Sequence, residues 1–159
     1  MTQQKSSKLI VENRKAYHDY HIEERMEAGL ELTGTEVKSI RQGRVNLNDS
    51  YAAVQQGELW LHGMHVSPYE QGNRYNVDPI RTRRLLMHKR EILRLFGIVR
   101  QEGLTLVPTK LYFKNGMVKA EISLARGKKN YDKRDSESKK QAVREIEKRL
   151  KDRRSNNQD

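Results

Sequence analysis

The C-terminal 34 residues, 126–159, most constrain what this chain can fold into. They contain 13 lysines and arginines, 7 aspartates and glutamates, and very few apolar side chains. A segment of this composition cannot bury enough apolar surface to offset the entropy lost on ordering. We therefore expect the folded domain to span residues 1–125 and a basic tail to span residues 126–159. A basic extension outside a compact body typically binds a polyanion, most often nucleic acid.

The composition of the whole chain indicates the same partner. The formal net charge is +11 and the pI is about 9.9, which favours nucleic acid or an anionic membrane. The sequence has no apolar run near the roughly 18 residues that a membrane-spanning helix needs. Its first eight residues are polar, unlike a signal peptide. Without cysteine there are no disulfides or thiolate zinc sites, so we expect a cytoplasmic protein.

Hydrophobic patterning in the first part of the body predicts a strand followed by a short helix. Apolar residues alternate with polar ones over residues 17–32, and Gly29 marks an expected bulge or corner. Thr33 and Glu36 have the spacing of a capping box, so a helix should begin there and end at Gly43. Further along, Gln56-Gly57 predicts a hairpin, and residues 67–79 form a loop rich in proline, glycine and asparagine.

The second part of the body predicts a helix over residues 89–101, with Gly103 just past its end. Strands should follow over residues 104–109 and 111–114, with Pro108 at an edge or bulge between them. Asn115-Gly116 is typical of a type I′ hairpin turn. After it, Val118, Ala120, Ile122 and Leu124 alternate with polar residues, so one face of that strand should be buried and the other solvated.

About six strands and two helices without regular β-α-β alternation favour a mainly β fold with a few helices. The form we expect is a small closed antiparallel β-barrel of the OB-fold type. In the tail, Val143, Ile146 and Leu150 follow helical spacing among basic residues. Such a helix buries too little to be stable alone, so we expect the tail to be disordered when free and helical when bound.

The sequence offers little for catalysis. The histidine pairs 18/21 and 62/65 are each three apart on predicted strands, so their members should point to opposite faces. The carboxylates between Glu23 and Glu36 are scattered, and no phosphate-binding glycine loop or nucleophile elbow is present. We therefore predict a protein that is not an enzyme, with no catalytic residue, no metal site and no cofactor.

Two segments have the composition of an RNA-binding surface. Arg81, Arg83 and Arg84 lie between a loop and a helix, and planar guanidinium groups suit phosphate, although a solvated helix entry explains them equally well. The adjacent Leu85 and Leu86 should be core or apolar support for a base or ribose. In the tail, Tyr131 lies among basic residues with no core to enter, so we expect it to stack on a nucleobase.

Several longer segments together closely resemble one family. They are Asn13-Arg14-Lys15-Ala16, His18-Asp19-Tyr20, Ile22-Glu23-Glu24, residues 27–39 (EAGLELTGTEVKS), Asn48-Asp49-Ser50-Tyr51, residues 78–86 (DPIRTRRLL) and residues 127–134 (GKKNYDKR). This set, in this order over nearly the whole chain, resembles the SsrA-binding protein family, SmpB. The resemblance implies an oligonucleotide-binding barrel that binds the tRNA-like domain of transfer-messenger RNA (tmRNA, SsrA) and delivers it to stalled ribosomes in trans-translation.

The resemblance also assigns roles to residues. The implied tmRNA-binding residues of the body are Asn13, Lys15, Glu27, Arg81, Arg83, Arg84 and Leu85. The tail is implied to occupy the empty decoding centre and mRNA channel next to small-subunit ribosomal RNA. The residues implied in ribosome binding are Gly127, Lys128, Lys129, Tyr131, Asp132, Lys133, Arg134, Ile146 and Leu150. An acidic Glu27 suits a base amino group or a basic neighbour better than a phosphate.

Two other functions fit parts of the sequence. A general OB-fold RNA-binding translation factor would use the tail for affinity alone. An RNA-processing enzyme would need a convergent acid–base or metal site, which the sequence does not offer. The prediction is therefore a monomeric, non-enzymatic adaptor between tmRNA and the ribosome.

Overall fold

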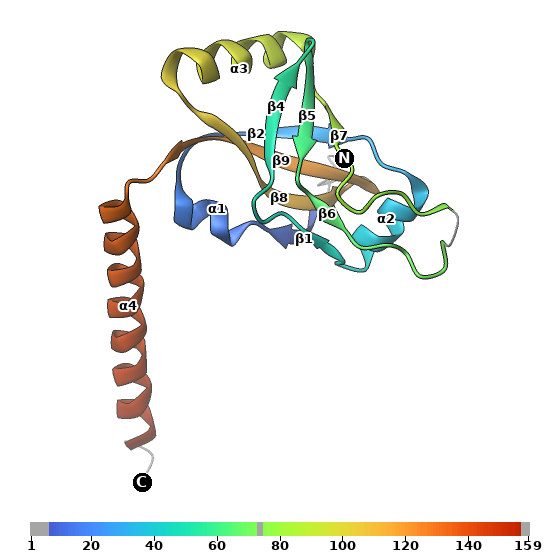
Figure 1. Cartoon of the computed structure of the whole chain (residues 1–159). Coiled ribbons are helices and arrows are strands. Elements are labelled where there is room, and N and C mark those ends of the chain that lie inside the picture. The colour runs from blue at the N-terminus through green and yellow to red at the C-terminus, as the bar shows by residue number, and fades with distance from the viewer. Residues whose placement is uncertain (1–6, 73–74, 157–159) are drawn as a thin grey trace, which may run out of the picture. The chain divides into compact units, whose positions relative to one another are not determined.

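A computed structural model of the chain describes residues 7–72 and 75–156. The chain divides into two compact units, Met1–Gly127 and Lys128–Asp159. The first unit, called the body here, is a mainly β fold with three helices among its described residues, and the second contains one helix (Figure 1).

The described residues of the body form nine strands and three helices. In chain order they are β1 (Ser7–Glu12), α1 (Arg14–Asp19), β2 (Tyr20–Leu30), α2 (Gly34–Arg41), β3 (Val45–Asn46), β4 (Tyr51–Gln55), β5 (Glu58–His62), β6 (His65–Val66), β7 (Arg83–Leu86), α3 (Lys89–Glu102), β8 (Thr105–Lys114) and β9 (Met117–Gly127).

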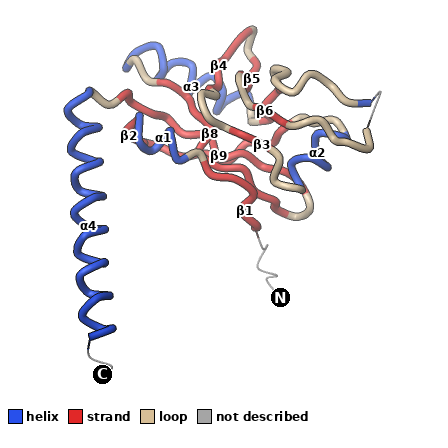
Figure 2. The backbone as a smooth tube through the Cα atoms, turned by 60° about the horizontal axis from the view of Figure 1, so that its bottom comes forward, coloured by secondary structure: helices blue, strands red, loops and turns tan. Residues whose placement is uncertain are grey.

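Strand pairing in the body follows a ring. β8 pairs with β9, β9 with β2, β2 with β7, β7 with β5, and β5 with β4, which returns to β8 (Figures 1 and 2). Each of these pairings is antiparallel, and two of them, β4–β5 and β8–β9, join strands connected by a short turn. β1 adds to the free part of β8, and β3 pairs with β6 in a separate two-stranded sheet.

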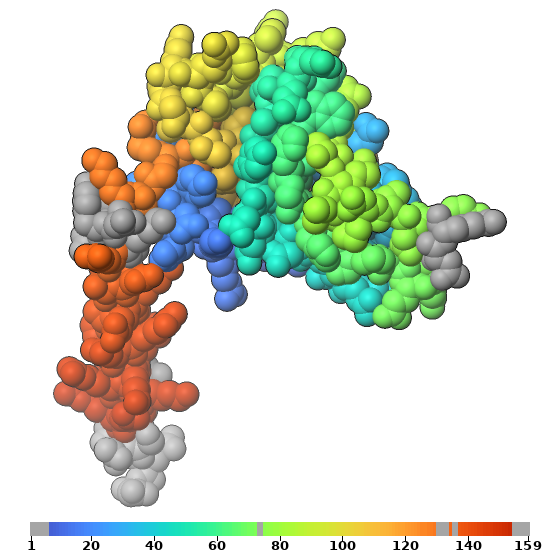
Figure 3. Space-filling view, in the orientation of Figure 1, coloured from blue at the N-terminus to red at the C-terminus, as the bar shows by residue number. Residues whose placement is uncertain are grey.

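The core lies on the inner face of these strands. Val118, Ala120, Ile122 and Leu124 on β9 are 7, 0, 0 and 2 % exposed, which confirms the buried face predicted from their alternation. α3 contributes Ile92 and Leu95 to the same cluster. On the surface, α3 lies beside the hairpin of β4 and β5 (Figures 1 and 3).

The local signals in the sequence are confirmed. The Thr33 hydroxyl accepts from the Glu36 backbone and the Glu36 carboxylate accepts from the Thr33 backbone, which completes the capping box of α2. Gly103 ends α3 in the left-handed region, with φ of 64°. Asn115 and Gly116 have φ of 54° and 74°, as a type I′ turn requires. The register of β8 against β9 shifts between Pro108 and Lys110, where an edge or bulge was predicted.

Several predictions about the body are wrong. β8 runs unbroken from Thr105 to Lys114 where two strands were expected, and the described residues form nine strands rather than about six. Residues 17–19 belong to α1 rather than to the start of a strand, because Asn13 caps the helix by accepting from the Ala16 backbone. The irregularity of β2 lies between Ile22 and Glu24, not at Gly29. Ser123 is buried rather than solvated, since Ala16 of α1 packs near it against Val107 and Ala125 and so covers that end of the sheet.

The second unit consists of α4 (Asn130–Asn156), which Figure 3 shows as a single column of side chains. Val143, Ile146 and Leu150 lie on this helix with the spacing seen in the sequence, and all three are exposed. Most of the other described side chains are charged. The disorder expected for the tail of the free protein stays a prediction.

Candidate nucleic-acid interface

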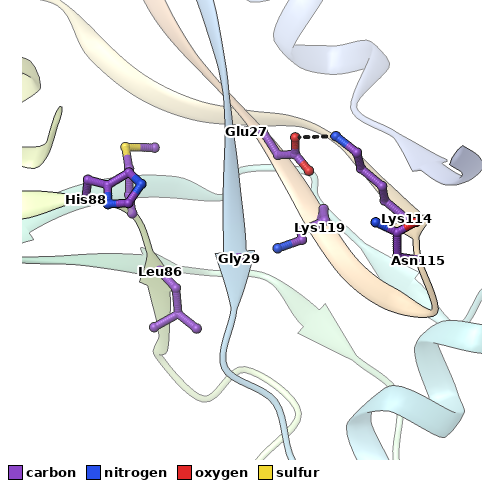
Figure 4. A pocket seen from close by; sticks show the side chains of 8 residues that line it. Glu27, Gly29, Leu86, His88, Lys114, Asn115 and Lys119 are labelled. Atoms are coloured by element: carbon purple, nitrogen blue, oxygen red, sulfur yellow. Dashed lines mark hydrogen bonds and ion pairs between the residues drawn. The ribbon is translucent and has the colours of Figure 1, made fainter. Parts of the chain in front are cut away.

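An open pocket of about 600 Å³ lies on the surface of the body where β2, β7 and the hairpin of β8 and β9 meet. We call it the Glu27 pocket. The residues that line it are Glu27, Gly29, Leu86, Met87, His88, Lys114, Asn115 and Lys119. Leu86 and His88 lie on one side of β2 and the two lysines on the other, with Gly29 between them (Figure 4).

The carboxylate of Glu27 organises one wall of this pocket. Lys114 Nζ donates to Glu27 Oε2 at 3.0 Å across 87 positions of sequence, and both side chains are about one third exposed. Burial raises the pKa of the nearby Tyr112 to about 12, and the charge of Glu27 acts in the same direction. Tyr112 therefore stays neutral at physiological pH. The ion pair with Lys114 holds Glu27 in place as an acceptor at the pocket wall.

Gly29 and Leu86 make the floor of the pocket. They pair across β2 and β7, and a Cβ atom on Gly29 would lie 3.1 Å from the Leu86 Cβ. Leu86 is 44 % exposed. An apolar floor beside the ammonium groups of Lys114 and Lys119 suits a ribose or base with phosphates at its edge.

The predicted site residue Leu85 is fully buried, whereas its neighbour Leu86 faces the pocket. In β7 the side chains of Arg83 and Leu85 point inward, and those of Arg84 and Leu86 point outward. Alternation along the strand predicts that the two leucines face opposite ways, but not which one is outside. The register of β7 against β2 and β5 decides it.

Arg83 is buried inside the body rather than displayed on its surface. Its Nε donates to Glu36, its Nη1 to the Met64 carbonyl at 2.7 Å and to the Arg81 carbonyl at 2.9 Å, and its Nη2 to the Pro79 carbonyl at 3.1 Å. The side chain is fully covered, so it presents no donor to a ligand outside. Arg83 instead holds the loop before β7 against α2.

Arg81 also forms an ion pair with the carboxylate of Glu36. Its Nη2 lies 2.6 Å from Glu36 Oε1, and its side chain is one third exposed. Burial pushes the pKa of Glu36 upward, but the hydrogen bonds from Arg81, the Thr33 backbone and Arg83 outweigh it, so the pKa lies below its ordinary value. Glu36 is therefore ionised at neutral pH, which is what the two guanidinium groups require.

Asn13 is also buried, at the start of α1. Its Nδ2 donates to the carbonyls of Leu47 at 3.2 Å and Pro108 at 2.9 Å, while its Oδ1 caps the helix. The side chain thus joins three segments and has no surface to offer a ligand. Lys15, two residues later, is exposed and forms an ion pair of 2.5 Å with Asp49, whose hydrogen bond raises the pKa of Lys15.

Arg84 points outward from β7 and is partly exposed. It donates to Glu58 from Nε at 3.2 Å and from Nη2 at 2.9 Å, and its Nη1 lies 3.9 Å from Glu31. Surface pairs of this kind are weak and exchange readily with other anions. Of the three predicted arginines, Arg84 is the most available to phosphate.

The tail residues of the prediction lie at the end of β9 and along α4. Gly127 ends β9, and Gly127 and Lys129 are exposed. Arg134, Ile146 and Leu150 are exposed on α4. Tyr131, Asp132 and Lys133 lie within the helix, but their side chains fall outside the described part of the structure.

Within the described ranges, 7–72 and 75–156, no three histidine or acidic side chains cluster in a way that could hold a metal ion. None of the helices described is long and apolar enough to cross a bilayer.

The family described as SmpB protein matches residues 10–152. The chain is 67 % identical to the SsrA-binding protein of Carboxydothermus hydrogenoformans over 143 residues, which cover 90 % of this chain and 96 % of that protein. It is 60 % identical to the SsrA-binding protein of Geobacillus kaustophilus over 92 % of this chain and 94 % of that one.

Among solved structures, the chain is similar to one described as "tmRNA-SmpB: a journey to the center of the bacterial ribosome". The TM-score is 0.64 and the sequence identity 54 %, over 76 % of this chain and 85 % of that one.

Proposed function

The chain belongs to the SmpB family, and from that membership we propose that it binds the tRNA-like domain of tmRNA and delivers it to stalled ribosomes. In this role the protein is a non-catalytic adaptor of the cytoplasm. A closed β-barrel of the OB-fold type is part of the proposal, and the ring of six strand pairings supports it.

The Glu27 pocket is the observation that carries the proposal. It combines an apolar floor at Gly29 and Leu86 with the cations Lys114 and Lys119 and one oriented acceptor, Glu27. Lysines can hold phosphates, and a fixed carboxylate can accept a hydrogen bond from the amino group of a base. An interface that contacts only the RNA sugar-phosphate backbone would not use such a carboxylate. The pocket thus suits a folded RNA with an accessible base.

The predicted RNA-binding residues of the body divide into two roles. Four of them have exposed side chains, and we assign direct RNA contacts to these: Glu27, Lys15, Arg84 and Arg81, of which Arg81 is the least exposed. The buried side chains act through the fold: Asn13 fixes α1, Arg83 fixes the loop before β7, and Leu85 anchors the strand that presents Leu86.

For the tail we propose entry into the vacant decoding centre and mRNA channel, beside small-subunit ribosomal RNA. The residues assigned to it are Gly127, Lys128, Lys129, Tyr131, Asp132, Lys133, Arg134, Ile146 and Leu150. Their support is the basic charge of the segment and the exposed apolar stripe of α4, which a ribosomal surface could cover.

Sequencing the RNA that co-purifies with the protein tests the proposal. We expect one dominant structured species with a tRNA-like acceptor arm. A broad mixture of cellular RNAs in proportion to their abundance would contradict it and would favour a general RNA-binding factor.

A further inference from the structure

A second pocket of about 480 Å³ lies on the body between β1, the end of α2 and the turn of the β8–β9 hairpin. It is lined by residues 8–10, residues 41–43, Phe113 and Gly116. We call it the Arg41 pocket. Among the described residues that line it, none is acidic, and two, Lys8 and Arg41, are cations.

The walls of the Arg41 pocket combine a cation with an aromatic ring. The Arg41 guanidinium carbon lies 5.8 Å from the centre of the Phe113 ring, and Lys8 pairs opposite Phe113 in the register of β1 against β8. Leu9 next to them is mostly exposed. A planar guanidinium over a ring, with apolar surface beside it, is a platform on which a nucleobase stacks.

The end of α2 adds hydrogen-bond acceptors to this platform. The amides that follow the helix donate backward, Gly43 to the Ile40 carbonyl at 2.9 Å and Arg44 to the Ser39 carbonyl at 3.0 Å. Within the described residues, the later carbonyls of Arg41 and Gln42 receive no backbone donor, as is usual for the last turn of a helix. Carbonyl acceptors beside a stacking surface match the amino group of a base.

We infer that the Arg41 pocket binds an unpaired nucleotide of the RNA held in the Glu27 pocket. The base would stack beside Phe113, and Lys8 and Arg41 would contact its phosphates. The two pockets share the turn of the β8–β9 hairpin: Lys114 and Asn115 line the first, and Phe113 and Gly116 line the second. An RNA strand would pass from the Glu27 pocket to the Arg41 pocket by crossing this turn. The inference rests on the proposed function.

The test uses the full-length chain and the tRNA-like domain of tmRNA transcribed with 4-thiouridine. Affinity is measured at several salt concentrations for wild type and for Arg41→Ala, and crosslinked peptides are identified by mass spectrometry. Arg100→Ala is the matched control, because Arg100 also lies over a phenylalanine, 5.2 Å from the Phe96 ring, but on α3 outside both pockets.

We expect Arg41→Ala to weaken binding roughly three- to tenfold and to lower the salt slope by about one, with Arg100→Ala unchanged. Crosslinks should join an unpaired nucleotide to the peptides around residues 8–10 or 41–43. Equal affinity of the two variants without such crosslinks overturns the inference. If the inference is overturned but Lys119→Ala still weakens RNA binding, the proposed function stands. If the wild-type chain does not bind the tRNA-like domain, the inference and the proposed function both fail.

Discussion

Arg83 and Glu36 form an ion pair inside the body, 47 positions apart in sequence, with a fully covered guanidinium and a carboxylate only 3 % exposed. The same carboxylate closes the capping box of α2 and accepts from Arg81. One acidic side chain thus connects the start of a helix to the strand whose outer face carries Arg84 and Leu86. The arginine-rich segment is therefore divided between a structural residue inside and a surface for ligands outside.

Replacing Arg83 by methionine should destabilise the body strongly. The substitution leaves the buried Glu36 with Arg81 as its remaining guanidinium partner, and breaking one side of a buried pair typically costs about 3–5 kcal/mol. Arg84→Met on the same strand is the control, because its pairs are at the surface and should cost at most about 1 kcal/mol. Urea unfolding of both variants measures the difference. Equal losses would show that Arg83 is not the structural residue that its contacts indicate.

The lowered pKa of Glu36 predicts a specific pH dependence of stability. The ordinary pKa is 4.5 and the folded value lies below it, so the stabilisation is complete above pH 4.5 and is lost as the pH falls through the folded value. The stability difference between wild type and Glu36→Gln should therefore be constant from pH 7 to about pH 5 and shrink in more acidic solution. Denaturant titrations at a series of pH values give this difference, and a constant gap down to pH 3 would be inconsistent with a stabilised carboxylate.

Lys119→Ala should weaken binding of the tRNA-like domain by roughly three- to tenfold and lower the salt slope by about one, because one phosphate contact is removed. Lys148→Ala removes the same charge from exposed α4 and should leave this affinity unchanged. Filter binding at two salt concentrations compares the variants. If both lower affinity alike, the body has no localised RNA site.

Gly29→Ala should impair RNA binding while the body stays folded. The new methyl group would meet the Leu86 Cβ at 3.1 Å and displace the floor of the Glu27 pocket. Gly34→Ala is the matched control, since no atom lies within 4 Å of its added Cβ. Thermal unfolding and RNA affinity are measured together for both. Unaltered affinity of a folded Gly29→Ala variant would exclude Leu86 from the interface.

Deleting residues 128–159 should preserve binding of the tRNA-like domain but abolish rescue of stalled ribosomes, because the body has its own core and the tail its own role. Lys133→Ala with Arg134→Ala should reproduce the rescue defect in a folded, full-length chain. Both are read out in a purified translation system supplied with a message that lacks a stop codon. Normal rescue by the truncated chain would refute the assignment of the tail.

Local features of this protein follow from the sequence alone. The turn at Asn115-Gly116, the capping box of Thr33 and Glu36, and the buried row from Val118 to Leu124 each depend on residues within a few positions of one another. Backbone sterics, side-chain capping and alternation act over that range, so these predictions are confirmed.

Only the tertiary structure decided which side chains form the surface. Leu86 rather than Leu85 faces outward, Arg83 is enclosed, and Glu27 meets Lys114 across 87 positions. These outcomes depend on the register of strands that are distant in sequence, and a shift of one residue would exchange the two faces. Ser123 is buried for the same kind of reason, because α1 packs over a strand face that alternation alone assigns to solvent.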